Sequence, residues 1–114
     1  MQVYVNDRTI ETNDQGYLCN LNDWSEDYVE TIAKQDGIDL YNDHWELILY
    51  FRDYYRENET CPTMHKVIRS LGSMKGKHFH NQKEYEKHIY SLFPQDPTHE
   101  VCKLAGLPMP PPDT

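Results

Sequence analysis

Residues 42–57 read NDHWELILYFRDYYRE, a helix-forming stretch with apolar side chains at almost every angle around the helix axis. A surface helix of a small protein has one apolar stripe, whereas a helix that is apolar nearly all round belongs inside a bundle. We therefore predict that this helix lies in the middle of a bundle. Its apolar side chains are Trp45, Leu47, Ile48, Leu49, Tyr50, Phe51, Tyr54 and Tyr55.

One helix is expected before this stretch. Its start is indicated by Asp23 and Glu26, which have the spacing of a capping box, and its end by Gly37. Between these residues the apolar side chains recur at helical spacing and form a stripe. The stripe consists of Trp24, Tyr28, Val29 and Ile32. After the central stretch, Pro62 is expected as the first residue of an amphipathic helix, because proline loses no hydrogen bond there. The stripe of that helix is Met64, Val67, Ile68 and Leu71.

Two further helices are predicted near the C-terminus, after a loop over residues 72–81. One starts at a cap on Asn81 and ends at Pro94, and its buried side is Tyr85, Ile89, Leu92 and Phe93. The other is short, with Asp96 as its N-cap, Pro97 as its first residue and Gly106 as its stop. Its apolar side is Val101, Leu104 and Ala105.

The two ends of the chain differ from this helical middle. At the start, alternating apolar residues on both sides of Asn6 and Asp7 predict a short β-hairpin. At the end, LPMPPPDT contains four prolines, which favour an extended, polyproline-like arm. The predicted fold is mainly α (α+β). It consists of one compact helical bundle over residues 1–106, with the N-terminal β-hairpin, and an extended, flexible C-terminal arm over 107–114.

The net charge of -8 is distributed unevenly. Residues 1–60 carry fourteen acidic side chains against four Lys or Arg, whereas the part from residue 61 onward is slightly positive. A basic face, defined as Lys66, Arg69, Lys75 and Lys77, is either a solvated surface or a docking surface for an acidic partner or a nucleic acid. The third helix could belong to a helix-turn-helix-like unit, but the negative net charge opposes DNA binding.

The composition also narrows the possible chemistry. Cys19, Cys61 and Cys102 lack the number and spacing of a disulfide framework or a zinc site, which favours a reducing cytoplasm. His78 and His80 belong to no four-ligand set, so no metal site is predicted. No stretch approaches the ~20 apolar residues that cross a bilayer, so no membrane association is expected. Hydrolase and phosphate-binding motifs are absent from the sequence, and no cofactor is expected.

Cys102 has the most informative setting of the three cysteines. In a regular helix its side chain lies about 60° from Ala105, at the edge of the apolar face, so we expect it to be half-buried. His99 and Lys103 favour a thiolate, whereas the position late in the helix disfavours negative charge. The sequence leaves its reactivity open. Cys19, in a turn, and Cys61, before a helix, are expected to be structural.

The segment KLAGLPMP at 103–110 directly follows Cys102 and is preceded by LFPQDPTHEV at 92–101. It resembles the C-terminal signature of the DsrC/TusE family of sulfur-relay proteins, also called the gamma subunit of dissimilatory sulfite reductase. The likeness continues upstream, in order, in IETNDQGYL, WSEDYVETIAKQDGIDL, HWELILYFRDYY and CPTMHKVIRSL. It implies a β-hairpin on a compact helical bundle with a mobile C-terminal arm, in agreement with the fold predicted from periodicity and caps.

The resemblance also implies where this chain departs from its family. Family members carry a working cysteine as the penultimate residue, where it holds a persulfide or enters a partner's active site. Members that act with sulfite reductase have a second cysteine upstream, and members for tRNA thiolation keep only the one at the tip. Here the upstream position is Cys102 and the tip position is Asp113. Aspartate cannot form a persulfide, so an internal link would require Cys102 to reach Cys19 or Cys61.

We therefore expect a sulfur-relay protein that docks its C-terminal arm on a sulfite reductase or sulfurtransferase, with Cys102 as the only plausible sulfur-bearing thiol. It would be a carrier or regulator more than a turnover enzyme. The docking residues implied by the resemblance are Lys103, Leu104, Ala105, Gly106, Leu107, Pro108 and Pro110. Two alternatives stay open, a regulatory module that binds protein or DNA through the basic face, and a decoy that fills a partner's cleft without reacting. Which sulfur pathway is involved also stays open.

Overall fold

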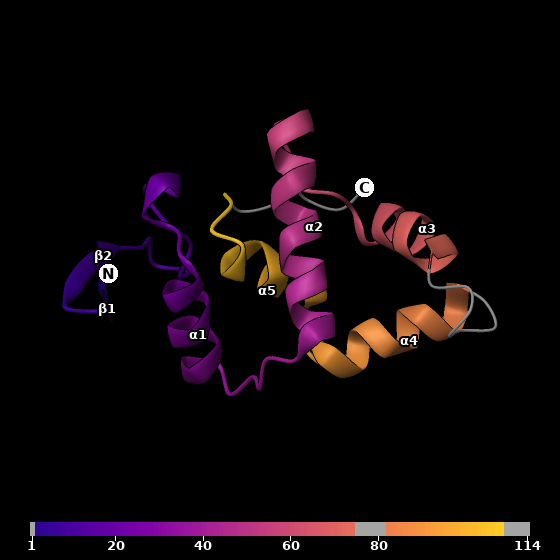
Figure 1. The fold of residues 1–114 in the computed structure, drawn as a ribbon, viewed down its shortest axis with the longest axis horizontal. Coiled ribbons are helices and arrows are strands. Elements are labelled where there is room, and N and C mark those ends of the chain that lie inside the picture. The colour runs from indigo at the N-terminus through magenta and orange to yellow at the C-terminus, as the bar shows by residue number, and fades with distance from the viewer. Residues whose placement is uncertain (1, 75–81, 109–114) are drawn as a thin grey trace.

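A computed structural model describes residues 2–74 and 82–108, and over these residues the chain is mainly helical (Figure 1). The strands are β1 (Gln2–Val5) and β2 (Arg8–Glu11), and a short 3-10 helix, η1, covers Leu21–Asp23. The helices are α1 (Glu26–Gln35), α2 (Asn42–Asn58), α3 (Met64–Met74), α4 (Gln82–Leu92) and α5 (Pro97–Leu104). The predicted combination of a helical domain with an N-terminal β-hairpin is confirmed.

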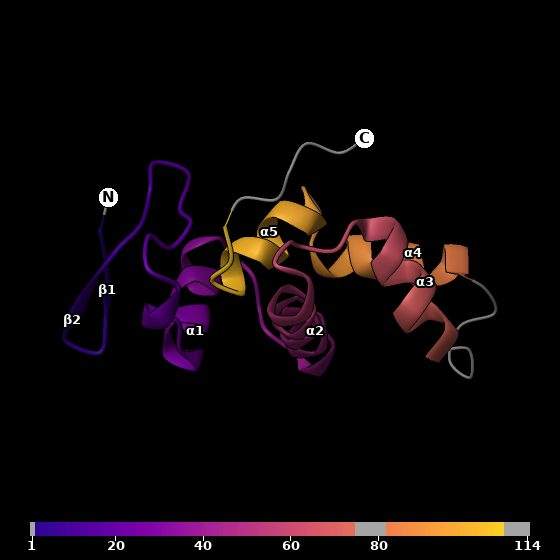
Figure 2. The ribbon, with the colours of Figure 1, turned by 90° about the horizontal axis from the view of Figure 1, so that it is seen from above.

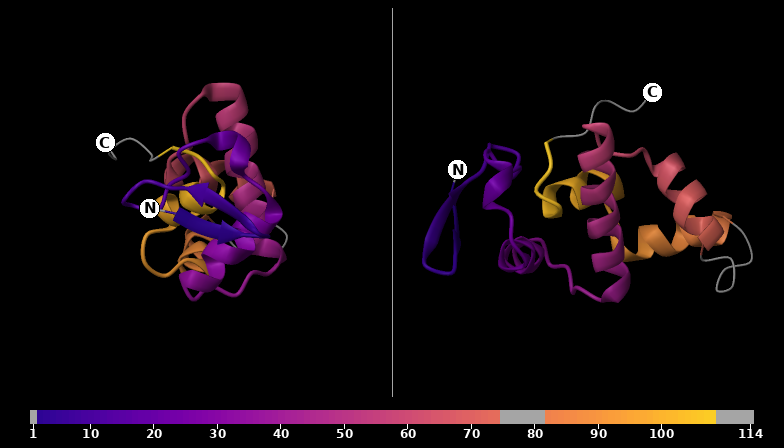
Figure 3. Two further views of the ribbon diagram at one scale, coloured as in Figure 1. Left: turned by 90° about the vertical axis from the view of Figure 1, so that its left-hand side faces the viewer. Right: turned by 45° about the horizontal axis from the view of Figure 1, so that its top comes forward.

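The β-hairpin packs on α1 at one end of the molecule (Figure 3). Its strands are antiparallel, with Val3 opposite Ile10 and Val5 opposite Arg8. The connecting residues Asn6 and Asp7 both have positive φ, 48° and 63°, as a two-residue turn of the primed type requires. Asn and Asp tolerate this conformation better than most residues, so these two neighbouring residues were enough to predict the turn of the hairpin.

The short helix α5 takes the central position that the sequence suggested for α2. It contacts α1, α2 and α4 (Figures 1 and 2), and Val101, Cys102 and Leu104 on it are fully buried. The prediction that α2 lies in the middle of the bundle is wrong in part, because α2 buries one face and leaves Leu49 50% exposed. The core face of α2 consists of His44, Leu47, Ile48 and Phe51.

Three helix boundaries differ from the prediction. Ser25, rather than Asp23, caps α1, because its hydroxyl accepts a hydrogen bond from the Tyr28 amide at 3.1 Å. Helix α3 begins at Met64 rather than Pro62, and the hydroxyl of Thr63 accepts from the Lys66 amide at 3.2 Å. The same helix continues to residue 74, through a glycine at 72, where a loop was expected.

The boundaries of α5 agree with the prediction. The Asp96 carboxylate accepts a hydrogen bond from the His99 amide, and Pro97 is the first helical residue. Gly106 has a φ of 71° and follows the last turn. The expected cap at Asn81 lies outside the described residues. None of the described helices combines the length and apolar character that crossing a membrane would require.

Candidate functional site

Cys102 lies deeper in the protein than its helix position suggested. The expectation of half-burial is wrong, since its side chain is fully buried. The reason is that α5 packs against three other helices, which cover the edges of its apolar face as well as the centre. The Sγ atom of Cys102 donates a hydrogen bond to the Sγ atom of Cys61, and the two sulfurs are 2.7 Å apart.

Cys61 connects this thiol to the start of the C-terminal arm. Its own Sγ lies 3.8 Å from the carbonyl oxygen of Pro108 and donates weakly to it. The three groups therefore form a chain from Cys102 through Cys61 to the Pro108 carbonyl. Sequence reasoning treated Cys61 as structural, because a separation of 41 residues gives no sign of contact.

The two thiols have different acidities. The hydrogen bond from Cys102, opposed by burial, lowers the pKa of Cys61. The same hydrogen bond, together with burial, strongly raises the pKa of Cys102. Because the thiolate is the nucleophilic form, Cys61 is the more reactive thiol of the pair in this conformation.

The chain after Cys102 is held in the core by two side chains from distant elements. We define residues 104–107 as the arm root. The indole Nε1 of Trp24 donates to the Leu104 carbonyl at 2.9 Å, and Nη1 of Arg52 donates to the Ala105 carbonyl at 2.7 Å. The Arg52 guanidinium also lies 3.8 Å from the centre of the Trp24 ring. A cation on an aromatic face stabilises both partners, so Trp24 and Arg52 act as one clamp.

Gly106 is required at this point of the arm root. Its positive φ is one that side chains with a Cβ rarely adopt. A Cβ at this position would lie 2.5 Å from Cδ1 of Trp24 and 2.9 Å from Cδ1 of Leu18, closer than real carbon atoms approach. The backbone at Gly106 therefore packs directly against the Trp24 side chain of the clamp.

The predicted docking residues are mostly part of the protein's own core. Leu104 and Ala105 are fully buried, and Leu107 is only 3% exposed. Pro108 is exposed, and Pro110 lies outside the described residues. In this conformation, the apolar part of the predicted docking segment is therefore inaccessible to a partner.

Lys103, also a predicted docking residue, is paired within the chain. Its Nζ lies 2.6 Å from Oδ2 of Asp36 and 3.6 Å from Oε2 of Glu100. Burial, and then a hydrogen bond to Asp36, raise the pKa of Glu100 to about 7. Burial alone would raise the pKa of Asp36, but hydrogen bonds from Glu100 and Lys103 lower it overall. The raised pKa of Glu100 therefore favours one protonated carboxyl group in this pair below about pH 7.

Open pockets adjoin these groups, and two of them bear on the site. One, of about 380 Å³, is lined by Asp36, Glu100, Lys103 and the segment 93–96. The other, of about 560 Å³, borders the arm root between α2 and η1, and its walls include Leu49, Arg52, Tyr55, Arg56 and Leu107. The second pocket therefore forms a groove next to the arm root.

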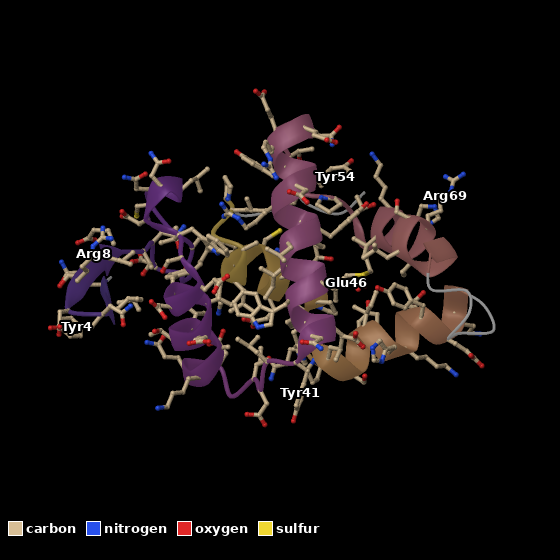
Figure 4. The ribbon with its side chains drawn as sticks, viewed as in Figure 1. Tyr4, Arg8, Tyr41, Glu46, Tyr54 and Arg69 are labelled. Atoms are coloured by element: carbon tan, nitrogen blue, oxygen red, sulfur yellow. The ribbon has the colours of Figure 1, made fainter. Side chains whose placement is uncertain are left out.

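The basic face is only partly described. Lys66 donates to the Tyr54 hydroxyl at 3.0 Å, and Arg69 projects outward from α3 (Figure 4). Lys75 and Lys77 lie outside the described residues, as do His78 and His80. Within residues 2–74 and 82–108, no group of three or more His, Cys, Asp or Glu could hold a metal ion.

Sequence comparison identifies the family. A family model described as "DsrC like protein" matches residues 4–112. The chain belongs to the DsrC-like family. It is also 37% identical over 103 residues to the sulfurtransferase TusE of Yersinia pseudotuberculosis, a match that covers 90% of this chain and 92% of that one.

Solved structures of DsrC-like proteins share the fold. The NMR structure of Allochromatium vinosum DsrC superimposes with a TM-score of 0.78 at 35% identity, covering 99% of this chain and 97% of that one. The oxidized gamma-subunit of the dissimilatory sulfite reductase from Archaeoglobus fulgidus has a TM-score of 0.79 at 26% identity, with complete coverage of both chains. The predicted family and fold class are both confirmed.

Proposed function

We propose that this DsrC-like chain is a cytoplasmic sulfur-relay protein that accepts sulfur on Cys102 and docks its C-terminal arm, residues 107–114, on a sulfite reductase or sulfurtransferase partner. The observation that carries the proposal is the place of Cys102, on the last turn of α5, two residues before the arm root begins, and in contact with a second thiol. The names of its relatives, sulfurtransferase and DsrC, support the same function.

Sulfur loading and docking are coupled in this proposal, because Cys102 is fully buried. A donor reaches the thiol only when α5 and the arm root leave the core together, which breaks the hydrogen bonds from Trp24 and Arg52 to the carbonyls of residues 104 and 105. A partner that occupies the groove beside the arm root competes with these contacts. Release also removes the burial that raises the pKa of Cys102, so the thiol ionises more readily once it is exposed.

The transfer step uses a persulfide on a donor protein. The Cys102 thiolate attacks the outer sulfur of the donor persulfide, forms a new S–S bond and breaks the old one. The donor leaves as a thiolate and takes up a proton. Cys102 then carries the persulfide, with no change in the total number of electrons.

Mass spectrometry of the intact protein tests this proposal. The chain is incubated with a cysteine desulfurase and cysteine, and we expect a gain of one sulfur. The gain is retained in Cys19→Ala, the matched control at an exposed cysteine, and lost in Cys102→Ala. We expect Arg52→Met to load faster, because it removes one half of the clamp. A gain that persists in Cys102→Ala, or no gain in any variant, would overturn the proposal.

The observations do not favour the DNA-binding alternative. Of the two described members of the basic face, Lys66 is engaged by Tyr54, and the net charge of the chain is -8. The decoy alternative makes a separate prediction, since it requires partner binding and no sulfur on the chain. The mass measurement above distinguishes it from the proposed function.

A further inference from the structure

Cys61 and Cys102 are 41 residues apart in the chain, yet their sulfur atoms are 2.7 Å apart. A disulfide bond has a length of ~2.05 Å, so the sulfurs need to approach by only about 0.7 Å to form one. Both residues belong to well-packed parts of the protein. On α5, Cys102 lies between Val101 and Leu104, which are both fully buried. Cys61 directly precedes Pro62, which is also buried. The buried contact therefore already holds the two sulfurs next to each other.

We propose that Cys61 and Cys102 form a reversible disulfide within this chain. The pair differs from the one that the family resemblance implies, in which the upstream cysteine joins a cysteine at the tip of the arm. Here the tip position is Asp113, and Cys61 stands in as the partner of Cys102. The proposal rests on the contact between the two sulfurs and holds whether or not Cys102 carries sulfur for a partner.

Exposure and acidity decide which thiol reacts first. Cys61 is 7% exposed and adjoins the exposed Pro108, whereas Cys102 has no exposed surface. The lowered pKa of Cys61 also favours its thiolate. An oxidant from solvent therefore reaches Cys61 first, and Cys102 is the resolving thiol.

The oxidant we specify is a low-molecular-weight disulfide of the glutathione type. The Cys61 thiolate attacks one sulfur of this disulfide, which forms a mixed disulfide and releases one small thiol. Cys102 then loses its proton and attacks the Cys61 sulfur, which releases the second small thiol. Cys61 and Cys102 are oxidised together by two electrons, and the small disulfide is reduced to two thiols.

The disulfide would change how α5 and the arm are held. It ties α5 covalently to the segment before α3, and so opposes the release of α5 from the core. At the same time, Cys61 loses its hydrogen and can no longer donate to the Pro108 carbonyl. Oxidation would therefore lock the helix while removing one weak contact to the beginning of the arm.

The experiment uses the full chain with Cys19→Ala, so that only the proposed pair remains. The protein is equilibrated with mixtures of oxidised and reduced glutathione, then analysed by intact mass and by alkylation of free thiols. We expect a loss of two hydrogens, simultaneous loss of both alkylation sites, a cross-linked peptide that joins residues 61 and 102, and full reversal by dithiothreitol. No variant of either proposed cysteine is needed for this measurement, so a folding defect cannot obscure it.

Two single replacements in the same background show the order of reaction. Cys102→Ala should accumulate one glutathione on Cys61, because the resolving thiol is missing. Cys61→Ala should stay unmodified, because Cys102 is buried. A stable glutathione adduct on Cys61 when Cys102 is present, or two thiols that stay reduced in oxidised glutathione, would overturn the proposal.

The outcome of this experiment is separable from that of the sulfur-loading test. A chain that forms the disulfide but accepts no sulfur from the desulfurase supports this inference and contradicts the proposed function. A chain that accepts sulfur on Cys102 but never forms the disulfide gives the opposite result.

Discussion

Helix α5 is anchored in two different ways on two of its sides. On the thiol side, Cys102 contacts Cys61 in the core through one hydrogen bond between the two sulfurs and through close packing. On the charged side, Lys103 and Glu100 meet Asp36, where all three side chains keep between 19% and 25% of their surface exposed. If the proposed disulfide forms, the thiol side responds to oxidants, whereas the raised pKa of Glu100 makes the charged side respond to protons. The comparison teaches that the two anchors of one short helix use different chemistry, so each can be tested separately.

The largest expected effect concerns the thiol side. Oxidation of the Cys61–Cys102 pair should raise the free energy of unfolding by about 4 kcal/mol, because closing a loop of this length restricts the unfolded chain. The measurement is urea unfolding of oxidised and reduced Cys19→Ala protein. Cys61→Ala in the same background serves as the control and should show no difference between the two conditions. A less stable oxidised protein would mean that the bond strains α5.

A smaller effect is expected when the charged side loses its cation. Lys103→Met should lower the free energy of unfolding by about 2 kcal/mol at pH 8, because it leaves the partly buried Asp36 and Glu100 without a positive partner. The loss should be smaller at pH 5, where the carboxyl pair holds its proton more fully. Lys34→Met, at an exposed lysine of α1, is the matched control. An equal loss at both pH values would contradict this account of the charged side.

The smallest effect concerns the proton of Glu100. The folded protein raises the pKa of Glu100 from its ordinary 4.5 to about 7, so the folded state binds this proton more tightly than the unfolded state does. The resulting stabilisation is present in acid and is lost as the pH rises through that interval. Glu100→Gln imitates the protonated group and should be as stable as the parent chain at pH 5 and more stable by about 1 kcal/mol at pH 8, after allowance for solvent screening.

Unfolding measured across this pH range provides the readout, and Glu30→Gln on the exposed side of α1 is the control. If Glu100→Gln were less stable than the parent chain at pH 8, Glu100 would stabilise the fold as an ionised partner of Lys103. Its pKa would then not be raised by folding. The part of the pH dependence that Glu100→Gln removes should be the same in oxidised and reduced protein, because Glu100 lies on the charged side.

The local features of the fold could be predicted from the sequence. The Asn6–Asp7 turn, the cap at Asp96 and the apolar stripes of the helices depend on residues close together in the chain. The central place of α5 could not, because its eight residues give a short pattern whose burial depends on packing against helices distant in sequence.

The candidate site could be predicted in part. Cys102 was found through its position before a recognisable segment, but its contact with Cys61 was missed because the two lie 41 residues apart. The clamp was missed for a similar reason. Trp24 and Arg52 bind backbone carbonyls. Every residue has a backbone carbonyl, so the amino-acid sequence does not indicate which carbonyls these side chains bind.

The hydrogen bond from Trp24 to the Leu104 carbonyl joins residues 80 positions apart, close to the two ends of the chain. It has a consequence for synthesis on the ribosome. The apolar faces of α1 and α2 are covered by α5 and the arm root, which are made long after α1 and α2. Because long-range contacts form only when both partners are available, the core cannot close while the C-terminal segment is still inside the exit tunnel. The nascent chain therefore completes its core only once α5 and the arm root have emerged from the ribosome.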